Sequence, residues 1–179
     1  MKRYVAFLRG INVGGRNILK MQEVRRGFVD LGFSDVSSFK ASGNILFETE
    51  DRPEKVTQLI SERLCEISGR DIGVFLRSSK QIVELLEVAP FEGRQADASK
   101  LYVTFLPSKY SPSNAMQMWS KNRDVEIIKV TESEVYSQTF LYKGRYGAPN
   151  KFIEDQLDIS ATTRNWNTVK GVHEKLIQS

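Results

Sequence analysis

The sequence predicts an α+β protein made of two similar halves, and two kinds of pattern support this class. Short apolar runs between turn residues predict strands, and segments with an apolar residue every three or four positions predict amphipathic helices. In residues 1–77 these patterns follow the order β-α-β-β-α-β, which is the order of a ferredoxin-like unit. We therefore expect an N-terminal ferredoxin-like subdomain (1–77) and a C-terminal α+β subdomain with a terminal helix (78–179), with their antiparallel sheets packed together.

The first half contains six predicted elements with clear boundary signals. Gly32 ends the first helix, which has apolar residues at helical spacing over residues 21–31. Asp51 is the expected cap of the second helix, with Pro53 in its first turn and Gly69 after its last turn. Each helix has one apolar stripe, so both should cover one face of the sheet and leave the other face free to bind or to pack. The expected strands are residues 4–8, 35–39, 45–48 and 72–76.

The second half follows the same order without a closing strand. Ser78 and Gln81 form a capping box for a helix that ends before Pro90. Ser111, followed by a proline, predicts the start of another helix, whose buried face includes Trp119. Strands are expected at residues 101–106, 125–130 and 135–142, a short helix at 152–157, and a last helix that opens at 162–165.

The composition describes a soluble, mildly basic protein. The 179 residues are 40% hydrophobic, which is enough for a substantial core, and the formal net charge is +4. No apolar run approaches the roughly 20 residues that span a bilayer, and the N-terminus does not resemble a signal peptide. Cys65 is the single cysteine, so no internal disulfide can form. We expect a cytoplasmic protein that is a monomer or a weak homodimer and has no membrane partner.

The stretch Arg9–Asn17 is the first candidate for a binding site. It follows a predicted strand and contains Gly10, Gly14 and Gly15 together with Arg16. Its spacing matches neither the dinucleotide fingerprint nor the phosphate-binding loop of nucleotidases. Backbone amides beside arginines can still hold an anion. A tight strand-to-helix connection explains the glycines equally well.

Three further segments carry polar residues at element ends. Thr162–Asn165 is expected at a helix start, where free amides favour an anion, although the threonines can simply cap the helix. Asn44 follows a glycine near an expected sheet edge, and this pair can also serve only to bend the backbone. Residues 143–151 form a basic loop flanked by Tyr142 and containing Tyr146, which suits nucleic acid or plain solvation.

Catalytic machinery is not evident. His173 is the single histidine and falls late in the last predicted helix, and Cys65 lies in an apolar helical segment. No histidine and cysteine cluster has the spacing of metal ligands, so no metal site is predicted. In an RNA-recognition fold, aromatic residues would stand at the positions of Ser42 and Asn44, so base stacking on the first sheet is not expected. Whether the protein is an enzyme, and whether it uses a cofactor, stays open.

Three motifs together resemble a known family. They are residues 8–15 (LRGINVGG) with Asn17 and Met21, residues 42–45 (SGNI) with Phe47, and residues 161–169 (ATTRNWNTV). This combination is similar to a bacterial family of uncharacterised proteins, catalogued as domain of unknown function 1697, from residue 4 to residue 176. The resemblance implies an α+β fold with two ferredoxin-like halves. It implies no reaction and no catalytic residues, because the family has no established activity.

We hypothesise that polar residues of these motifs converge in one cleft between the halves and bind a small anionic ligand. A phosphate- or carboxylate-bearing molecule, including a nucleotide, suits such donors, which lie at element ends. Two alternatives stay open: nucleic-acid binding through the basic loops, or a polar network that only locks the structure. The proposed ligand-binding residues are Arg9, Asn12, Gly14, Gly15, Asn44, Thr163, Arg164, Asn165 and Asn167.

Overall fold

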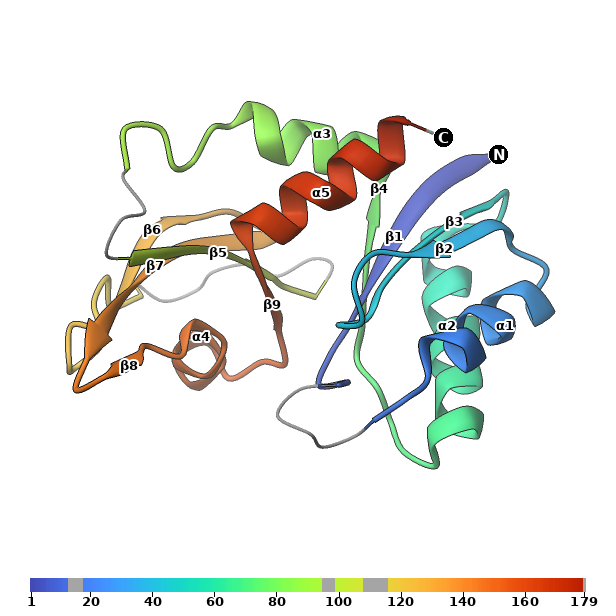
Figure 1. Cartoon of the computed structure of the whole chain (residues 1–179), viewed down its shortest axis with the longest axis horizontal. Helices are drawn as coiled ribbons and strands as arrows, with labels where there is room; N and C mark the ends of the chain where they lie inside the picture. The colour runs from blue at the N-terminus through green and yellow to red at the C-terminus, as the bar shows by residue number, and fades with distance from the viewer. Residues whose placement is uncertain (13–17, 95–98, 108–115, 179) are drawn as a thin grey trace. The chain divides into compact units, whose positions relative to one another are not determined.

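The protein forms two compact units, each built around one antiparallel sheet (Figure 1). The computed structural model describes residues 1–12, 18–94, 99–107 and 116–178. Unit 1 comprises Met1–Glu84 and Gly171–Ser179, and unit 2 comprises Leu85–Lys170. The subdomain boundary expected between residues 77 and 78 stays a prediction.

Unit 1 has the predicted ferredoxin-like order of elements. Its sheet has the strand order β2-β3-β1-β4, in which all neighbours are antiparallel. Figure 1 shows α1 and α2 on the same face of this sheet, as their single apolar stripes indicated. The elements are β1 (Lys2–Leu8), α1 (Met21–Asp30), β2 (Ser34–Ser38), β3 (Asn44–Thr49), α2 (Pro53–Ser68) and β4 (Val74–Ser78).

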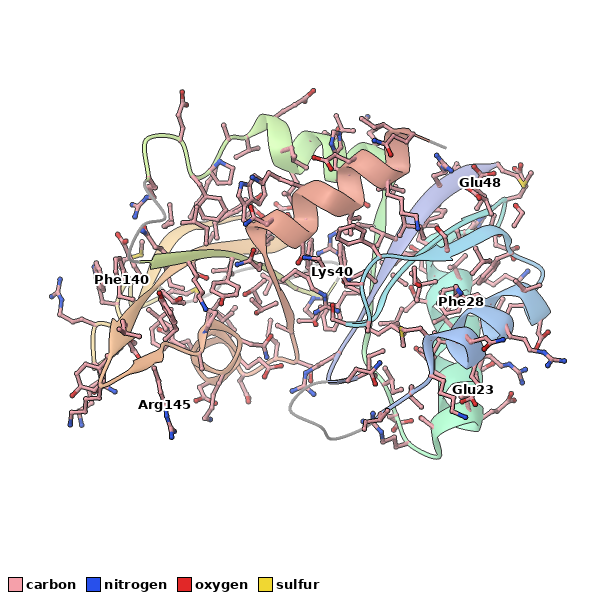
Figure 2. The ribbon with its side chains drawn as sticks, viewed as in Figure 1. Glu23, Phe28, Lys40, Glu48, Phe140 and Arg145 are labelled. Carbon is pink, nitrogen blue, oxygen red and sulfur yellow. The ribbon has the colours of Figure 1, made fainter. Side chains whose placement is uncertain are left out.

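The core of unit 1 lies between the sheet and these two helices. Alternate residues of β1 and β3 point into it, and they meet the apolar stripes of the helices. Phe28 of α1 contacts Phe47 edge to face at a centroid distance of 5.2 Å, and Phe33 stacks on Phe47 at 4.7 Å. Figure 2 labels Phe28 at this position. These aromatic contacts fix the helix layer on the sheet.

The opposite face of the unit 1 sheet is buried, so of its two expected roles, to bind or to pack, the structure agrees with packing. Val5, Phe7, Leu46 and Phe75 on that face are between 0% and 6% exposed. Consecutive residues of β1 are apolar, so both faces of this central strand avoid water. Two further helices are α3 (Ser79–Glu87) and α5 (Trp166–Ile177). The last part of α5 belongs to unit 1, where Arg3 donates a hydrogen bond to the carbonyl of Leu176.

Unit 2 repeats the topology of unit 1. Its main strand order is β6-β7-β5-β9, which matches β2-β3-β1-β4 strand for strand, and β8 extends β7. The helix α4 packs against β5, β7 and β9. The elements are β5 (Ser99–Phe105), β6 (Val125–Val130), β7 (Glu134–Tyr142), β8 (Arg145–Tyr146), α4 (Pro149–Leu157) and β9 (Thr162–Asn165).

The closing strand of unit 2 is β9, which was not predicted, and the last helix begins directly after it, so of the segment expected to open that helix only Asn165 takes part in its start. β9 pairs with β5 from Phe105 opposite Thr162 to Tyr102 opposite Asn165. All four residues of β9 are polar, and a four-residue polar segment has no apolar alternation to mark it as a strand. The pairing with β5 decides its conformation, and this long-range effect is invisible in a local pattern.

α2 begins at Pro53 as expected, but its predicted cap residue was wrong, and the predicted helix start at Ser111 lies outside the described residues. Asp51 does not cap α2, because Arg52 occupies the N-cap position and the carboxylate of Asp51 instead accepts a bond from Lys55 at 2.7 Å. The expected start at Ser111 is untested, because residues 108–115 lie outside the described residues. Trp119, which was expected on the buried face of that helix, instead forms a β-bridge with Glu126. This bridge extends the sheet beside β6.

The capping box at α3 is confirmed. The amide of Ser78 donates to Gln81 Oε1 at 2.9 Å, and the amide of Gln81 donates to Ser78 Oγ at 3.3 Å. The reciprocal bonds satisfy two of the amides that have no partner inside the helix. A local motif with both partners in the sequence was sufficient to place this helix start.

Candidate functional site

The side-chain amide of Asn12 bonds to the protein backbone. Its Nδ2 group donates to the carbonyl of Leu19 at 3.0 Å and to the carbonyl of Ala41 at 2.8 Å. Its Oδ1 accepts the amide of Leu19 at 2.8 Å. Asn12 has a φ of 53°, a conformation that asparagine tolerates better than most residues. Both donors and one acceptor position of this side chain are therefore occupied by the protein itself.

The first and second motifs meet at Gly43. A Cβ atom at Gly43 would lie 2.7 Å from Cδ1 of Ile11 and 3.0 Å from Cβ of Leu8, and its φ is +74°. The amide of Leu8 also donates to the carbonyl of Gly43 at 2.8 Å. Only glycine fits both the backbone conformation and the space beneath the buried side chain of Ile11.

Asn44 is fully buried at the start of β3, an interior strand of the sheet. Its Nδ2 group donates to the carbonyl of Phe39 at 2.8 Å and to Ser42 Oγ at 3.2 Å, while the amide of Phe39 donates to the carbonyl of Asn44 at 2.9 Å. These bonds hold the turn between β2 and β3. The position is not at a sheet edge, which corrects the predicted placement.

Arg9 and Gly10 begin the turn after β1. Arg9 is exposed, and its amide donates to the carbonyl of Gly73 at 2.8 Å. Gly10 has a φ of +67° with open space around its Cβ position, so backbone conformation alone explains this glycine. Gly14 and Gly15 lie outside the described residues.

In the third motif, β9 and the first turn of α5 hold Thr163, Asn165 and Asn167. Thr163 Oγ1 lies 2.7 Å from Thr104 Oγ1 and donates to Asn150 Oδ1 at 2.9 Å, so Thr104 supplies the proton of the first bond. Asn165 Oδ1 accepts the amide of Asn167 at 3.0 Å. Asn165 is therefore the cap of α5, a role that the sequence analysis had assigned to the threonines.

Arg164 points to the opposite face of β9. Its Nη1 donates to Thr162 Oγ1 at 2.8 Å and to the carbonyl of Thr163 at 2.9 Å. The residue as a whole is half-buried, but its guanidinium is surrounded by protein, and this burial lowers its pKa to about 10. The guanidinium still carries its charge at neutral pH.

The structure thus groups the predicted site residues into two sets. Arg9, Asn12 and Asn44 belong to unit 1, where the turn after β1 and the turn before β3 are in contact. The residues of β9 and of the first turn of α5 belong to unit 2. The hypothesis that both sets share one pocket stays a prediction.

Sequence reasoning missed a polar sheet face in unit 2. Residues directly opposite in antiparallel strands share a face, and Tyr102 of β5 stands opposite Ser137 of β7 and Asn165 of β9. Thr104 and Thr139 follow on the same face, which also carries Val125 and Ile127 and is covered by α4. Alternation of polar residues along both β5 and β7 is the signal that could have found it.

Two buried hydroxyls on this face have no normal hydrogen bond. Ser137 and Thr139 are 0% exposed, and their hydroxyl oxygens have no geometrically acceptable partner among the described residues. Tyr102 lies close by, and burial raises its pKa, while interactions with Thr139 and Asn165 oppose that rise.

The start of α4 lies above these hydroxyls. A Cβ atom at Gly147 would lie 2.6 Å from Cγ2 of Val125 on β6, whereas Asn150 bonds to Thr163 on β9. The segment from 147 to 150 therefore crosses the sheet over its two central strands. These are β7, which carries Ser137 and Thr139, and β5, which carries Tyr102. The N-cap of α4 is Ala148, whose side chain makes no capping bond, and Pro149 has no amide hydrogen.

The expected basic loop at residues 143–151 is not one loop. Residues 145–146 form β8, which pairs with the end of β7, and α4 already begins at Pro149. Lys100 Nζ lies 4.1 Å from the ring centroid of Tyr146, and Lys143 Nζ lies 5.3 Å from that of Tyr142. Cations and aromatic rings are thus paired on both faces of this short hairpin.

Among the described residues, no group of three or more histidine, cysteine or acidic side chains could hold a metal ion. Cys65 is half-buried within α2, and His173 lies on α5. None of the described helices is long and apolar enough to cross a membrane. No catalytic constellation emerges in the described parts of the chain.

The fold and the polar residues define an α+β protein with two ferredoxin-like units and motif residues at the ends of strands. The chain belongs to the family described as "Protein of unknown function (DUF1697)", whose sequence model matches residues 1–136. The third motif, at residues 161–169, lies outside that match.

A solved structure, that of the conserved bacterial protein SP0830 from Streptococcus pneumoniae, has the same fold. The TM-score is 0.70, the sequence identity is 20%, and the match covers 98% of each chain. At this level of identity the likeness concerns the fold alone. A search among curated proteins finds no match.

Proposed function

We propose that this protein binds a small ligand carrying a phosphate or carboxylate group, and that the anion lies at the start of α4 in unit 2. The amides in the first turn of a helix have no partner within the helix, and the helix dipole favours a negative charge beside them. Ala148 supplies no side-chain cap, so the amides of Asn150 and Lys151 are suited to bind an anion.

Lys100 supports an anionic ligand at this position. It is exposed on the face of β5 that carries α4, and its ammonium group lies over the ring of Tyr146. Lys100 has no carboxylate partner in the described part of the chain, whereas Lys55 pairs with Asp51. An unpaired cation beside an uncapped helix start adds to the positive potential that the helix dipole produces there.

The observation that carries the proposal is the pair of unpartnered hydroxyls of Ser137 and Thr139. A buried hydroxyl without a hydrogen bond costs about 1–3 kcal/mol, so native proteins normally provide a partner. Both hydroxyls lie beneath the start of α4, beside the hydroxyl of Tyr102. Both side chains are 0% exposed, so oxygen atoms of a ligand, or a water that it orders, would supply the partners once the start of α4 moves aside.

Tyr146 favours a ligand that has a ring as well as an anionic group. Its side chain is 37% exposed, so part of the ring surface is available for stacking. A nucleoside monophosphate combines such a ring with sugar hydroxyls and a phosphate. This is the ligand class for which the helix start, the hydroxyls and the cation–aromatic pair are jointly suited.

The experiment is a calorimetric titration with inorganic phosphate, ribose 5-phosphate and adenosine monophosphate. We expect the nucleotide to bind most tightly, and Lys100→Ala to weaken it about tenfold, which corresponds to about 1.4 kcal/mol. Lys80→Ala, which removes an exposed cation of α3, is the matched control and should leave binding unchanged. Absence of binding for all three probes, or equal loss in both variants, contradicts the proposal.

Ala148→Asp gives a sharper test, because an aspartate at the N-cap offers its own carboxylate to the free amides. We expect this variant to bind none of the probes while folding normally. Undiminished binding in Ala148→Asp would exclude the start of α4 as the anion site.

A second role, in stability, is favoured for the motif residues of unit 1. The amide groups of Asn12 and Asn44 already donate both hydrogens to the protein. We propose that these residues lock the turns that flank β1 and β3. We also propose that the protein works as a monomer or weak homodimer in the cytoplasm, which sedimentation and cell fractionation can test.

A further inference from the structure

The face of the β7–β8 hairpin that points away from α4 has its own cluster of aromatic and cationic side chains. Tyr142 pairs with Arg145 across the hairpin, and Phe140 shares their face two residues earlier on β7. Trp119 stacks on Phe140 at a centroid distance of 5.7 Å and an interplanar angle of 23°. Arg123 lies 4.6 Å from the centroid of the Trp119 ring. We call this cluster, together with Lys143, the hairpin patch.

The cations of the hairpin patch have no acidic partners among the residues that the structure describes. Arg123, Lys143 and Arg145 are exposed, and none forms an ion pair within the described part of the chain. Figure 2 shows the side chain of Arg145 directed away from the ribbon. Elsewhere arginines pair with carboxylates, as Arg63 does with Asp30 at 2.6 Å. Three unpaired positive charges around aromatic rings indicate a partner with negative charge.

Tyr142 leaves ring surface available for stacking, whereas the ring of Trp119 is already layered. Tyr142 is 40% exposed, and Trp119 is half-buried between Phe140 and Arg123. Lys143 Nζ lies 5.3 Å from the centroid of the Tyr142 ring. An exposed tyrosine with cations around it suits planar groups that alternate with negative charges.

We propose that the hairpin patch binds single-stranded nucleic acid, with a base stacked on Tyr142 and phosphates held by Arg123, Lys143 and Arg145. A charged polymer without rings would use the cations but not the aromatic surfaces. The patch lies on the other side of the hairpin from Lys100 and the start of α4, and it shares no residue with that site. The two proposals can therefore fail independently.

The two tryptophans of the chain allow a direct measurement. Trp166→Phe leaves Trp119 as the single indole reporter, and Trp119→Phe leaves Trp166, which packs edge to face on Phe91 in unit 2. The probe is a 15-nucleotide oligouridylate. A phosphate bound by Arg123 should draw its guanidinium away from the Trp119 ring, so the oligonucleotide should change the fluorescence of the Trp166→Phe protein and leave that of Trp119→Phe unchanged. Equal changes in both, or a change in neither, overturns the proposal.

Tyr142→Ala tests the stacking contribution without depending on tryptophan. Fluorescence anisotropy of an end-labelled oligouridylate should show affinity reduced about tenfold, within the range for one stacked base. The logarithm of the binding constant should fall with the logarithm of the salt concentration with a slope of about −2, as expected for three phosphates on a single strand. Unchanged affinity in Tyr142→Ala overturns the stacking assignment.

Charge-matched variants separate the patch from general basicity. The double variant Lys143→Glu and Arg145→Glu and the control Lys20→Glu and Lys80→Glu each lower the formal net charge from +4 to 0. Only the first should abolish binding of the oligonucleotide. Equal loss in both, equal binding of inorganic polyphosphate, or binding of phosphatidylserine vesicles in place of the oligonucleotide would each overturn the proposal.

Discussion

Replacement of Gly43 by alanine should strongly destabilise the protein, because two separate physical effects act at this position. A φ of +74° costs a residue with a Cβ about 1–2 kcal/mol relative to glycine. The new Cβ would also lie 2.7 Å from Ile11 Cδ1 and 3.0 Å from Leu8 Cβ. Ile11 and Leu8 are each 1% exposed, so neither can move aside into solvent.

The expected magnitude follows from these two effects. Overpacking in a closed core costs about 1–3 kcal/mol. Alanine also reduces the conformational freedom of the unfolded chain, which stabilises the folded state by about 0.4–1 kcal/mol. The net loss for Gly43→Ala is therefore about 3 kcal/mol. For a chain of this size that loss corresponds to a fall in melting temperature of about 8 °C.

Gly10→Ala is the matched control, because Gly10 has a φ of +67° but no atom within 4 Å of its Cβ position. It retains the conformational strain and lacks the overlap, so its loss should be about 1 kcal/mol. Thermal unfolding followed by circular dichroism measures both variants. Equal losses in the two would refute the contact between the first two motifs, and no loss in Gly43→Ala would refute the backbone conformation as well.

Three further predictions concern single side chains. Asn12→Ala should reduce the free energy of unfolding by about 2–3 kcal/mol in urea denaturation, because three hydrogen bonds are lost; an unchanged midpoint contradicts that role. Ala148→Asp should increase the melting temperature by about 3 °C through a new helix cap worth about 1 kcal/mol; a decrease would mean that the start of α4 is not free. Burial raises the pKa of Tyr102 above its ordinary value of 10.0, so the folded state holds this proton more tightly and wild-type stability should fall as the pH rises above 10. The difference in unfolding free energy between the wild type and Tyr102→Phe should therefore be constant below pH 10. Above pH 10 the wild type should lose stability relative to the variant, and a pH-independent difference would contradict the raised pKa.

Much of the fold could be predicted because its signals are local. The capping box of Ser78 and Gln81 contains both bonding partners, and Gly69 ends α2 in the left-handed conformation that glycine adopts readily. The segment 162–165 gave no such signal, since its strand conformation depends on β5, about 60 residues earlier in the chain. Asp51 shows the opposite error, in which a suitable cap residue forms an ion pair with Lys55 instead.

The candidate site was harder to predict than the fold. A polar residue at an element end can bind a ligand or satisfy the backbone, and the sequence is the same in both cases. Asn12 and Asn44 satisfy the backbone, and Asn165 caps α5. The polar face that includes Ser137 and Thr139 was missed because its members are 30 or more residues from Tyr102 and meet only through strand pairing. Spacing along the chain carries no information about such a face until the register is known.

The most direct test is a nuclear magnetic resonance titration of the labelled protein with adenosine monophosphate. The account predicts that the backbone amides of Asn150 and Lys151 shift with increasing ligand, while the side-chain amides of Asn12 and Asn44 do not. Shifts confined to Asn12 and Asn44 would contradict it, because they would show that the turns of unit 1 bind the anion and that the start of α4 does not.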